Sequence, residues 1–248
     1  MKARGSFLRW VVLALGSAGL CATAAAEGAA ELAKSLGVTA AHAAFNGVWL
    51  AEKATPRLLT VEGAPPPLRP EAKKLYEERQ AARRAGDTSF DRTTWCASPG
   101  IPRLMFVRHP FEIAVSARRV AFLYSWSNWY RTVDMSGVKW PVDDEYSSMG
   151  VGMGKWEGNT LVIETIGFRS EPILDREGLP HSAGLKLTER VRLLNPDTLE
   201  VQFRFDDAES FQKPWSAVMT YRRQPNDAAQ EFICLDELKK GRPGLIEN

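Results

Sequence analysis

LKLTERVRLL, residues 185–194, is the stretch that decides the fold of this 248-residue chain. Apolar and polar side chains alternate along it, and this period of two marks a strand with one buried and one solvated face. Glu189 breaks the pattern, because it takes an apolar position between Leu187 and Val191. The stretch therefore predicts a strand that carries one carboxylate on its buried face.

The loop that precedes this strand, residues 169–184, concentrates titratable side chains. They are Asp175, Arg176, Glu177 and His181. A loop of this length can act as a lid over one end of a barrel. An inward carboxylate beneath such a loop is the best candidate for a functional site in the chain.

Further alternating segments fill residues 106–223. Runs such as Val120–Trp126 and Leu199–Phe205 are separated by turn sequences, of which Ser127-Asn128 is one. Since no long amphipathic helix interrupts the series, the strands are expected to be antiparallel. We predict an all-β, mainly antiparallel domain that closes into a barrel, because closure removes exposed strand edges.

The N-terminal residues have the layout of a secretory signal peptide. Lys2, Arg4 and Arg9 precede a short apolar run and then alanines with Ala-x-Ala spacing, so we assign residues 1–26 to the leader. The run is too short to span a membrane. Removing the three basic residues from the 32 Lys and Arg leaves 29 against 30 Asp and Glu, a net charge of −1. We expect a periplasmic or secreted protein without a nucleic-acid partner, since no basic stripe is present.

The rest of the chain divides into three parts. They are a flexible or helical lead-in (27–44), a barrel domain (45–236) and a C-terminal tail (237–248). A polyproline connector and a surface helix, residues 64–86, are inserted into the barrel domain. Pro70 suits the first position of that helix and Gly86 suits its end.

Two cysteines, Cys96 and Cys234, remain once the leader is removed. In an oxidising compartment we expect them to form a disulfide that ties the segment before the strands to the C-terminal segment. The alternative is a catalytic thiol, which needs a nearby base and no partner cysteine. The spacings of structural zinc sites are absent from the sequence, so we expect no metal.

Eight short motifs together resemble one protein family. They are Phe45-Asn46-Gly47-Val48-Trp49, Pro99-Gly100-Ile101-Pro102-Arg103, Gly154–Thr165 (GKWEGNTLVIET), Leu174-Asp175-Arg176, Pro180-His181-Ser182, Thr188-Glu189-Arg190, Asp197-Thr198-Leu199-Glu200 and Lys213-Pro214-Trp215. With them, residues 45–236 resemble a family of secreted, mostly uncharacterised bacterial proteins whose barrels are similar to lipocalins and other calycins. The resemblance implies a lipocalin-like, calycin-like barrel but hardly any activity. The chain departs from the family pattern at Val151-Gly152, where relatives often carry a His, and at Ala183-Gly184, where an acid is usual.

Glu189 has two interpretations. Arg131 also takes the apolar parity of its predicted strand, so the two charges can form a buried pair that fixes strand register. An ionised carboxylate in an apolar interior costs several kcal/mol unless it is paired in this way. Alternatively, Glu189 faces a ligand as a general acid or base with a raised pKa. A combined role, in which Arg131 holds Glu189 ionised, remains open.

His181 is a second candidate for proton transfer near neutral pH, and Asp175 could orient its imidazole. The alternative is that His181 only hydrogen-bonds the loop backbone. Ser182 is a poor nucleophile, because adjacent Ser and His rarely meet in the required geometry and the chain has no Gly-x-Ser-x-Gly elbow. The catalytic candidates are therefore Glu189, His181, Asp175 and Arg131, and no cofactor is expected.

Most of the aromatic residues belong to the predicted core, but some can line a pocket. The ligand-binding candidates are Tyr124, Trp126, Trp129, Tyr130, Arg176 and Phe203. We expect the barrel cavity to bind a small, largely apolar molecule, aromatic or isoprenoid-like.

Two alternatives to a binding protein stay open. The first is a cofactor-free lyase or isomerase, in which Glu189 and His181 exchange protons with the ligand. Arg131 or Tyr130 would then stabilise the developing negative charge. The second alternative is a structural envelope protein with a filled barrel. The sequence leaves the oligomeric state open.

Overall fold

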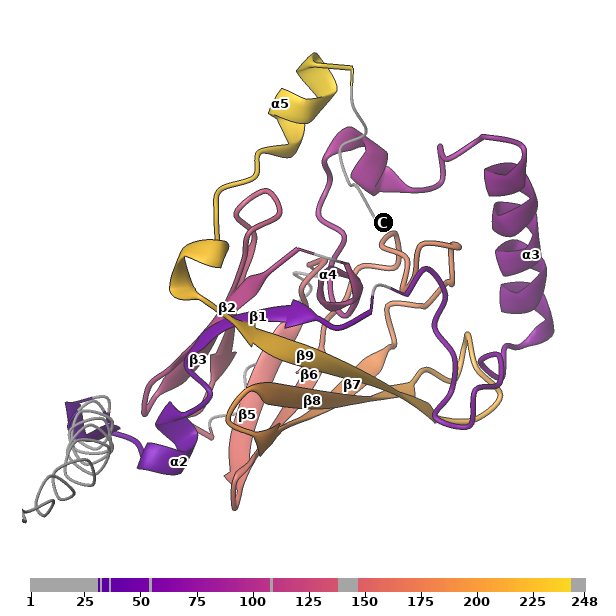
Figure 1. Ribbon diagram of the computed structural model, residues 1–248. Coiled ribbons are helices and arrows are strands. Elements are labelled where there is room, and N and C mark those ends of the chain that lie inside the picture. The colour runs from indigo at the N-terminus through magenta and orange to yellow at the C-terminus, as the bar shows by residue number, and fades with distance from the viewer. Residues whose placement is uncertain are drawn as a thin grey trace, which may run out of the picture.

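The computed structural model describes residues 31, 33–35, 37–53, 55–107, 109–137 and 147–241. Among these residues, nine strands form one closed barrel, in which β1 pairs with β9 (Figure 1). The strands are β1 (Gly47–Ala51), β2 (Phe111–Val115), β3 (Arg119–Tyr124), β4 (Tyr130–Asp134), β5 (Val151–Glu157), β6 (Thr160–Ile166), β7 (Lys186–Asn195), β8 (Thr198–Asp206) and β9 (Trp215–Gln224). The predicted barrel is confirmed. The predicted signal peptide lies outside the described residues.

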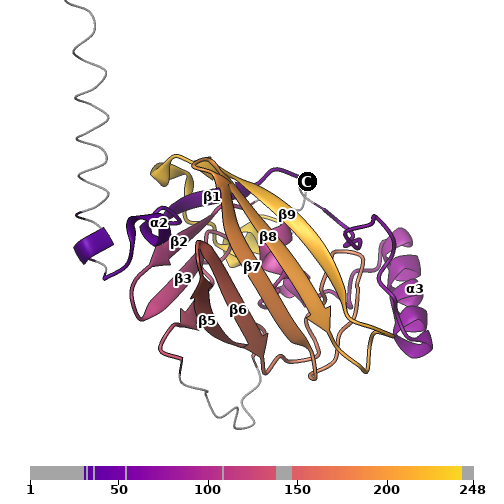
Figure 2. The ribbon, with the colours of Figure 1, turned by 90° about the horizontal axis from the view of Figure 1, so that it is seen from below.

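Strand pairing follows the order of the chain around the barrel (Figure 2). Every pairing is antiparallel except that of β4 with β5, which is parallel and short, with Val133 opposite Gly152 and Asp134 opposite Met153. The hairpin between β3 and β4 turns at Ser127 and Asn128, which both have a φ of 53°. Positive φ at both central residues is what the tight hairpin turn requires. The predicted turn at these two residues is therefore confirmed.

The alternation predicted for residues 185–194 is present in β7. Leu187, Glu189 and Val191 are buried, whereas Lys186 and Arg190 are exposed. The inner parity continues onto β8, where Phe203 stands opposite Glu189. Both of these side chains are completely buried. Period-two patterning thus carries a carboxylate into the barrel interior.

Aromatic side chains and a short helix fill much of the interior. Trp49 of β1 is completely buried, donates from Nε1 to the carbonyl of Phe45 and lies under the guanidinium of Arg223. All four residues of helix α4 (Arg103–Phe106) are buried. The Phe106 ring meets Phe203 edge-on, with ring centroids 5.1 Å apart. Burial of such large rings supplies a large share of the apolar stabilisation.

Helix α3 (Pro70–Arg84) forms where the sequence predicts a surface helix, with Pro70 in its first turn. It lies to one side of the barrel, and its buried residue is Tyr76 (Figure 1). The other helices are α2 (Ala40–Ala43), η1 (Arg92–Trp95), η2 (Asn226–Ala228) and α5 (Cys234–Lys239). None of the described helices is long and apolar enough to cross a membrane.

A disulfide joins Cys96, which follows η1, to Cys234 at the start of α5. The predicted disulfide is confirmed. It fixes the C-terminal segment to the segment that precedes the strands. Phe232, just before Cys234, forms an isolated parallel bridge with Trp126, so the end of the domain is held at two nearby points.

Candidate functional site

A buried ion pair lies inside the barrel between Arg131 of β4 and Glu189 of β7. Arg131 donates from Nη1 to Oε1 of Glu189 at 3.0 Å and from Nη2 to Oε2 at 2.5 Å. Nη2 also donates to Oγ1 of Thr165 on β6 at 3.0 Å. Arg131 is 3% exposed and Glu189 is 0% exposed. The two-pronged geometry satisfies both carboxylate oxygens, which is what makes the burial of two opposite charges tolerable.

The surroundings of Arg131 explain how its side chain is accommodated. Its register partner on β3 is Phe122, and the guanidinium carbon lies 5.3 Å from the centroid of that ring. Gly152 of β5 lies beside the guanidinium, where a Cβ would make an ordinary van der Waals contact of 3.5 Å with Nη2 of Arg131. Burial disfavours the charged guanidinium, but the adjacent Glu189 carboxylate raises the pKa of Arg131. Arg131 is therefore a cation at all physiological pH values.

Tyr124 of β3 extends this polar cluster. Its hydroxyl lies beside Arg131 and Glu189, close enough for both charges to act on its pKa. Burial is the largest effect and raises the pKa of Tyr124, so the phenol stays protonated. Among the described residues, neither the Tyr124 hydroxyl nor Nε of Arg131 has a hydrogen-bond partner of regular geometry. Buried polar atoms without partners are uncommon and call for an explanation.

Asp175 does not orient His181, contrary to our expectation. Its carboxylate accepts hydrogen bonds from the backbone N–H of Leu58 and Leu179 and from the Tyr76 hydroxyl, at 2.9–3.0 Å. These contacts tie the loop before β7 to helix α3. Burial raises the pKa of Asp175, against the effect of these hydrogen bonds. The residue has the surroundings of a structural anchor.

His181 is buried and bonded to its own loop. Nδ1 lies 2.8 Å from the carbonyl oxygen of Ser182, to which it donates, and the ring meets Phe168 edge-on. Burial lowers the pKa of His181. Ser182 donates from its hydroxyl to Asp207 at 2.7 Å. The Ser182 hydroxyl is thus directed to a carboxylate, and this arrangement agrees with the poor nucleophile that the sequence predicts.

Tyr130 lies on the outer surface of the barrel. It alternates with Arg131 along β4, and its side chain is 67% exposed. It therefore cannot stabilise a negative charge that develops next to Glu189, and that part of the lyase hypothesis is wrong. The same alternation that turns Arg131 inward turns its neighbour outward.

The other ligand-binding candidates occupy different environments. Trp126 and Phe203 are completely buried. Trp129 is half-buried at the end of the β3–β4 turn, and Arg176 is half-buried in the loop before β7. Two of the six ligand-binding candidates adjoin the ion pair. Phe203 is the register partner of Glu189, and the Tyr124 hydroxyl lies beside both charges.

Sequence reasoning missed three residues of the interior cluster. Thr165 shares the inner parity of β6 with Leu161 and Ile163, and a polar residue at that parity is a signal of the same kind as Glu189. Tyr221 of β9 is completely buried and donates from its hydroxyl to the carbonyl of Met105 at 3.0 Å. The sequence marked Gly152 only as a departure from the family pattern, and the structure places it beside Nη2 of Arg131.

Comparisons with known proteins give a similarity to solved structures alone. No model of a known protein family and no curated protein sequence matches the chain. Among solved structures, a Schistosoma mansoni fatty acid binding protein in complex with arachidonic acid is similar at 12% sequence identity. The match covers 75% of this chain and 99% of that chain, with a TM-score of 0.37. The strand pairing described above establishes the barrel independently of this likeness.

Proposed function

We propose that the barrel binds one small, largely apolar molecule that carries a neutral hydrogen-bond acceptor. The observation that carries this proposal is a pair of buried donors, the Tyr124 hydroxyl and Nε–H of Arg131. The two side chains contact each other, but neither donor has a hydrogen-bond partner of regular geometry among the described residues. A buried donor left unsatisfied costs about 1–3 kcal/mol. A ligand oxygen that accepts a hydrogen bond from the Tyr124 hydroxyl would recover that free energy and fix the orientation of the ligand.

The charge balance favours a neutral ligand over an acid. Glu189 already neutralises Arg131 through two hydrogen bonds. A ligand carboxylate would therefore bring an uncompensated negative charge into an apolar environment, which is costly. The rings of Phe122 and Phe203 beside the pair favour an aromatic or isoprenoid body.

Binding is better supported than catalysis. A general base needs a carboxylate oxygen that is free to accept a substrate proton. Both oxygens of Glu189 accept from Arg131, and proton uptake by Glu189 would leave the guanidinium unpaired. The lyase or isomerase thus remains a secondary hypothesis, and conversion of a bound compound that is lost in Glu189→Gln would support it. We also propose that the protein is periplasmic or secreted, which the Cys96–Cys234 disulfide supports.

Titration with retinol, an uncharged isoprenoid alcohol, tests the binding proposal. We expect saturable binding, observed as retinol fluorescence enhancement, with about one molecule per chain. Tyr124→Phe should lower the affinity for retinol by about three- to tenfold, which corresponds to the loss of one neutral hydrogen bond. The matched control is Tyr130→Phe, which removes the same hydroxyl from the outer surface and should leave the affinity unchanged. Absence of saturable binding to the folded wild-type protein would favour the filled structural barrel instead.

A further inference from the structure

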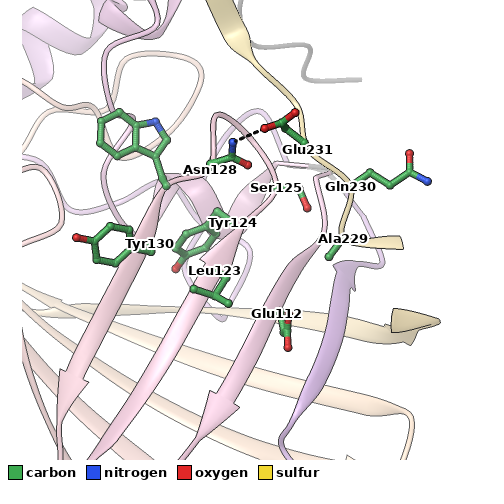
Figure 3. Close-up of a pocket in the computed structure, with 10 residues that line it drawn as sticks. Glu112, Leu123, Tyr124, Ser125, Asn128, Tyr130, Ala229, Gln230 and Glu231 are labelled. Atoms are coloured by element: carbon green, nitrogen blue, oxygen red, sulfur yellow. Dashed lines mark hydrogen bonds between the residues drawn. The ribbon is translucent and has the colours of Figure 1, made fainter. Parts of the chain in front are cut away.

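A groove opens on the outside of the barrel, at the end of the β3–β4 hairpin (Figure 3). We call it the rim groove. Its volume is about 390 Å³, and its walls include Glu112, Ser125, Trp129, Tyr130 and the segment 229–231. In Figure 3 Glu231 and Glu112 lie toward opposite ends of the groove, and Tyr130 lies beside it. Glu112 and Tyr130 belong to the outer parity of their strands. Neither Arg131 nor Glu189 lines the groove, whereas Tyr124 does.

One wall of the rim groove is fastened to the barrel by several contacts. The N–H of Ser127 donates to the carbonyl of Phe232 at 2.6 Å, and the N–H of Cys234 donates to Oγ of Ser127 at 3.1 Å. The disulfide from Cys234 to Cys96 lies immediately beyond. The segment 229–231 is thereby held against the hairpin, so the groove is a built feature of the fold.

The charge of the rim groove is negative. Glu112 and Glu231 both line it, and none of the described residues that line it is Lys, Arg or His. Neither carboxylate forms an ion pair with a described residue. Glu231 accepts a hydrogen bond from Nδ2 of Asn128 at 3.4 Å, and this neutral contact does not compensate its charge. Two carboxylates at one groove, with no counter-charge among the described residues, attract a cation.

The same groove offers aromatic and polar contacts. Tyr130 is 67% exposed, which is unusual for so large a side chain, and Trp129 is half-buried next to it. The faces of such rings attract cations, most strongly those with a weakly hydrated alkylammonium group. Ser125, 8% exposed, has an Oγ without a hydrogen-bond partner among the described residues, and Nε1 of Trp129 is in the same state. Both atoms are buried in the groove wall, so a shift of the side chain is needed before either can bind a polar group attached to the cation.

We propose that the rim groove binds a small organic cation of the alkylammonium class. The positive charge lies between Glu112 and Glu231, and its alkyl groups contact the rings of Trp129 and Tyr130. Neither Arg131 nor Glu189 lines the groove, although Tyr124 does, so the charges that bind the cation are those of Glu112 and Glu231 and not the interior ion pair. Inorganic cations lack the apolar surface that the rings recognise, so the groove selects against them.

Calorimetric titration with choline, compared with its uncharged analogue in which carbon replaces the ammonium nitrogen, tests this assignment. We expect saturable binding of choline that is at least about tenfold tighter than binding of the analogue. Glu112→Gln and Glu231→Gln should each weaken choline by about tenfold, and Tyr130→Ala by a similar factor. The control is Glu164→Gln, an exposed carboxylate of β6 outside the groove, which should change nothing.

Each variant is compared with the wild type in thermal unfolding, so that a loss of binding in a folded variant is attributed to the groove. Equal affinity for choline and its analogue would overturn the proposal, because the groove would then recognise shape without charge. Choline binding that persists in both Glu→Gln variants would overturn it as well. Failure of retinol binding leaves this result untouched, since Glu112, Glu231 and Tyr130, whose variants test the groove, take no part in the interior site.

Discussion

Arg131 and Glu189 join two strands that do not pair with each other. They are 58 residues apart in the chain, and they meet across the interior through two hydrogen bonds. A register slip of one residue in either β4 or β7 would move one charge to the outer surface and leave the other buried alone. The pair therefore penalises the wrong register of both strands at once.

Removal of one partner should be strongly destabilising. We expect Glu189→Leu to lower the free energy of unfolding by about 3–5 kcal/mol, because it leaves the Arg131 cation buried and unpaired. Arg131→Met combined with Glu189→Leu should recover most of this loss. Urea unfolding at pH 7 measures the free energy of unfolding of the single and the double variant. If Glu189→Leu is instead more stable than the wild type, the carboxylate is retained against stability, and a role in function follows.

The hydrogen bond from Tyr76 to Asp175 fastens helix α3 to the loop before β7. Tyr76→Phe should lower the free energy of unfolding by about 1 kcal/mol, since Asp175 keeps its two backbone donors. Asp175→Ala leaves all three donors without an acceptor and should cost about 3 kcal/mol. Chemical denaturation of the two variants gives this comparison. Equal losses in both would show that the backbone donors contribute nothing.

Lowering the pH should reduce the free energy of unfolding, and part of this loss should come from His181. Burial holds the pKa of His181 below its ordinary value of 6.5. As the pH falls below about 6.5, the unfolded chain takes up a proton at this imidazole and the folded chain does not, so stability declines by at most about 1.4 kcal/mol per pH unit. The decline stops at the folded pKa, and above 6.5 the contribution is complete.

His181→Gln should therefore show a flatter stability profile than the wild type between pH 7 and pH 5. The measurement is the free energy of unfolding at several pH values in this range. Parallel profiles for the two proteins would contradict the lowered pKa, as would an imidazole that titrates above 6.5 in NMR spectra of the folded protein.

Loss of the disulfide should destabilise the whole domain. The bond closes a sequence separation of 138 residues, and removing a native disulfide from a secreted domain costs about 2–5 kcal/mol. We expect Cys96→Ser with Cys234→Ser to melt at a lower temperature than the wild type. Dithiothreitol should lower the melting temperature of the wild type alone. A double variant that melts like the oxidised wild type would contradict this expectation.

Period-two patterning accounts for most of the structural features that the sequence could predict. It assigned Glu189 and Arg131 to the inner faces of their strands, and turn chemistry located the hairpin at Ser127 and Asn128. These features depend on neighbours in the sequence. The same alternation assigned Tyr130 to the outer face, and choosing it as an interior ligand residue ignored that parity.

Period-two alternation could not predict contacts between segments that are distant in the sequence. The partner of Asp175 is Tyr76, on a helix 99 residues earlier in the chain, and not the nearby His181. Helix α4 contributes buried side chains to the core although its residues have no strand pattern. Period-two alternation shows which face of a strand is buried, but it does not show which other element covers that face.

The contact between β1 and β9 sets the order in which the domain can be completed. Arg223 donates to the carbonyl of Asn46 across 177 residues of chain. A polypeptide that leaves the ribosome or a translocation channel with its N-terminus first presents β1 long before β9 exists. The pairing of β1 with β9 is therefore the last to form. Until then β1 has an open edge that can pair with another chain. Assistance by a chaperone would matter most in that interval.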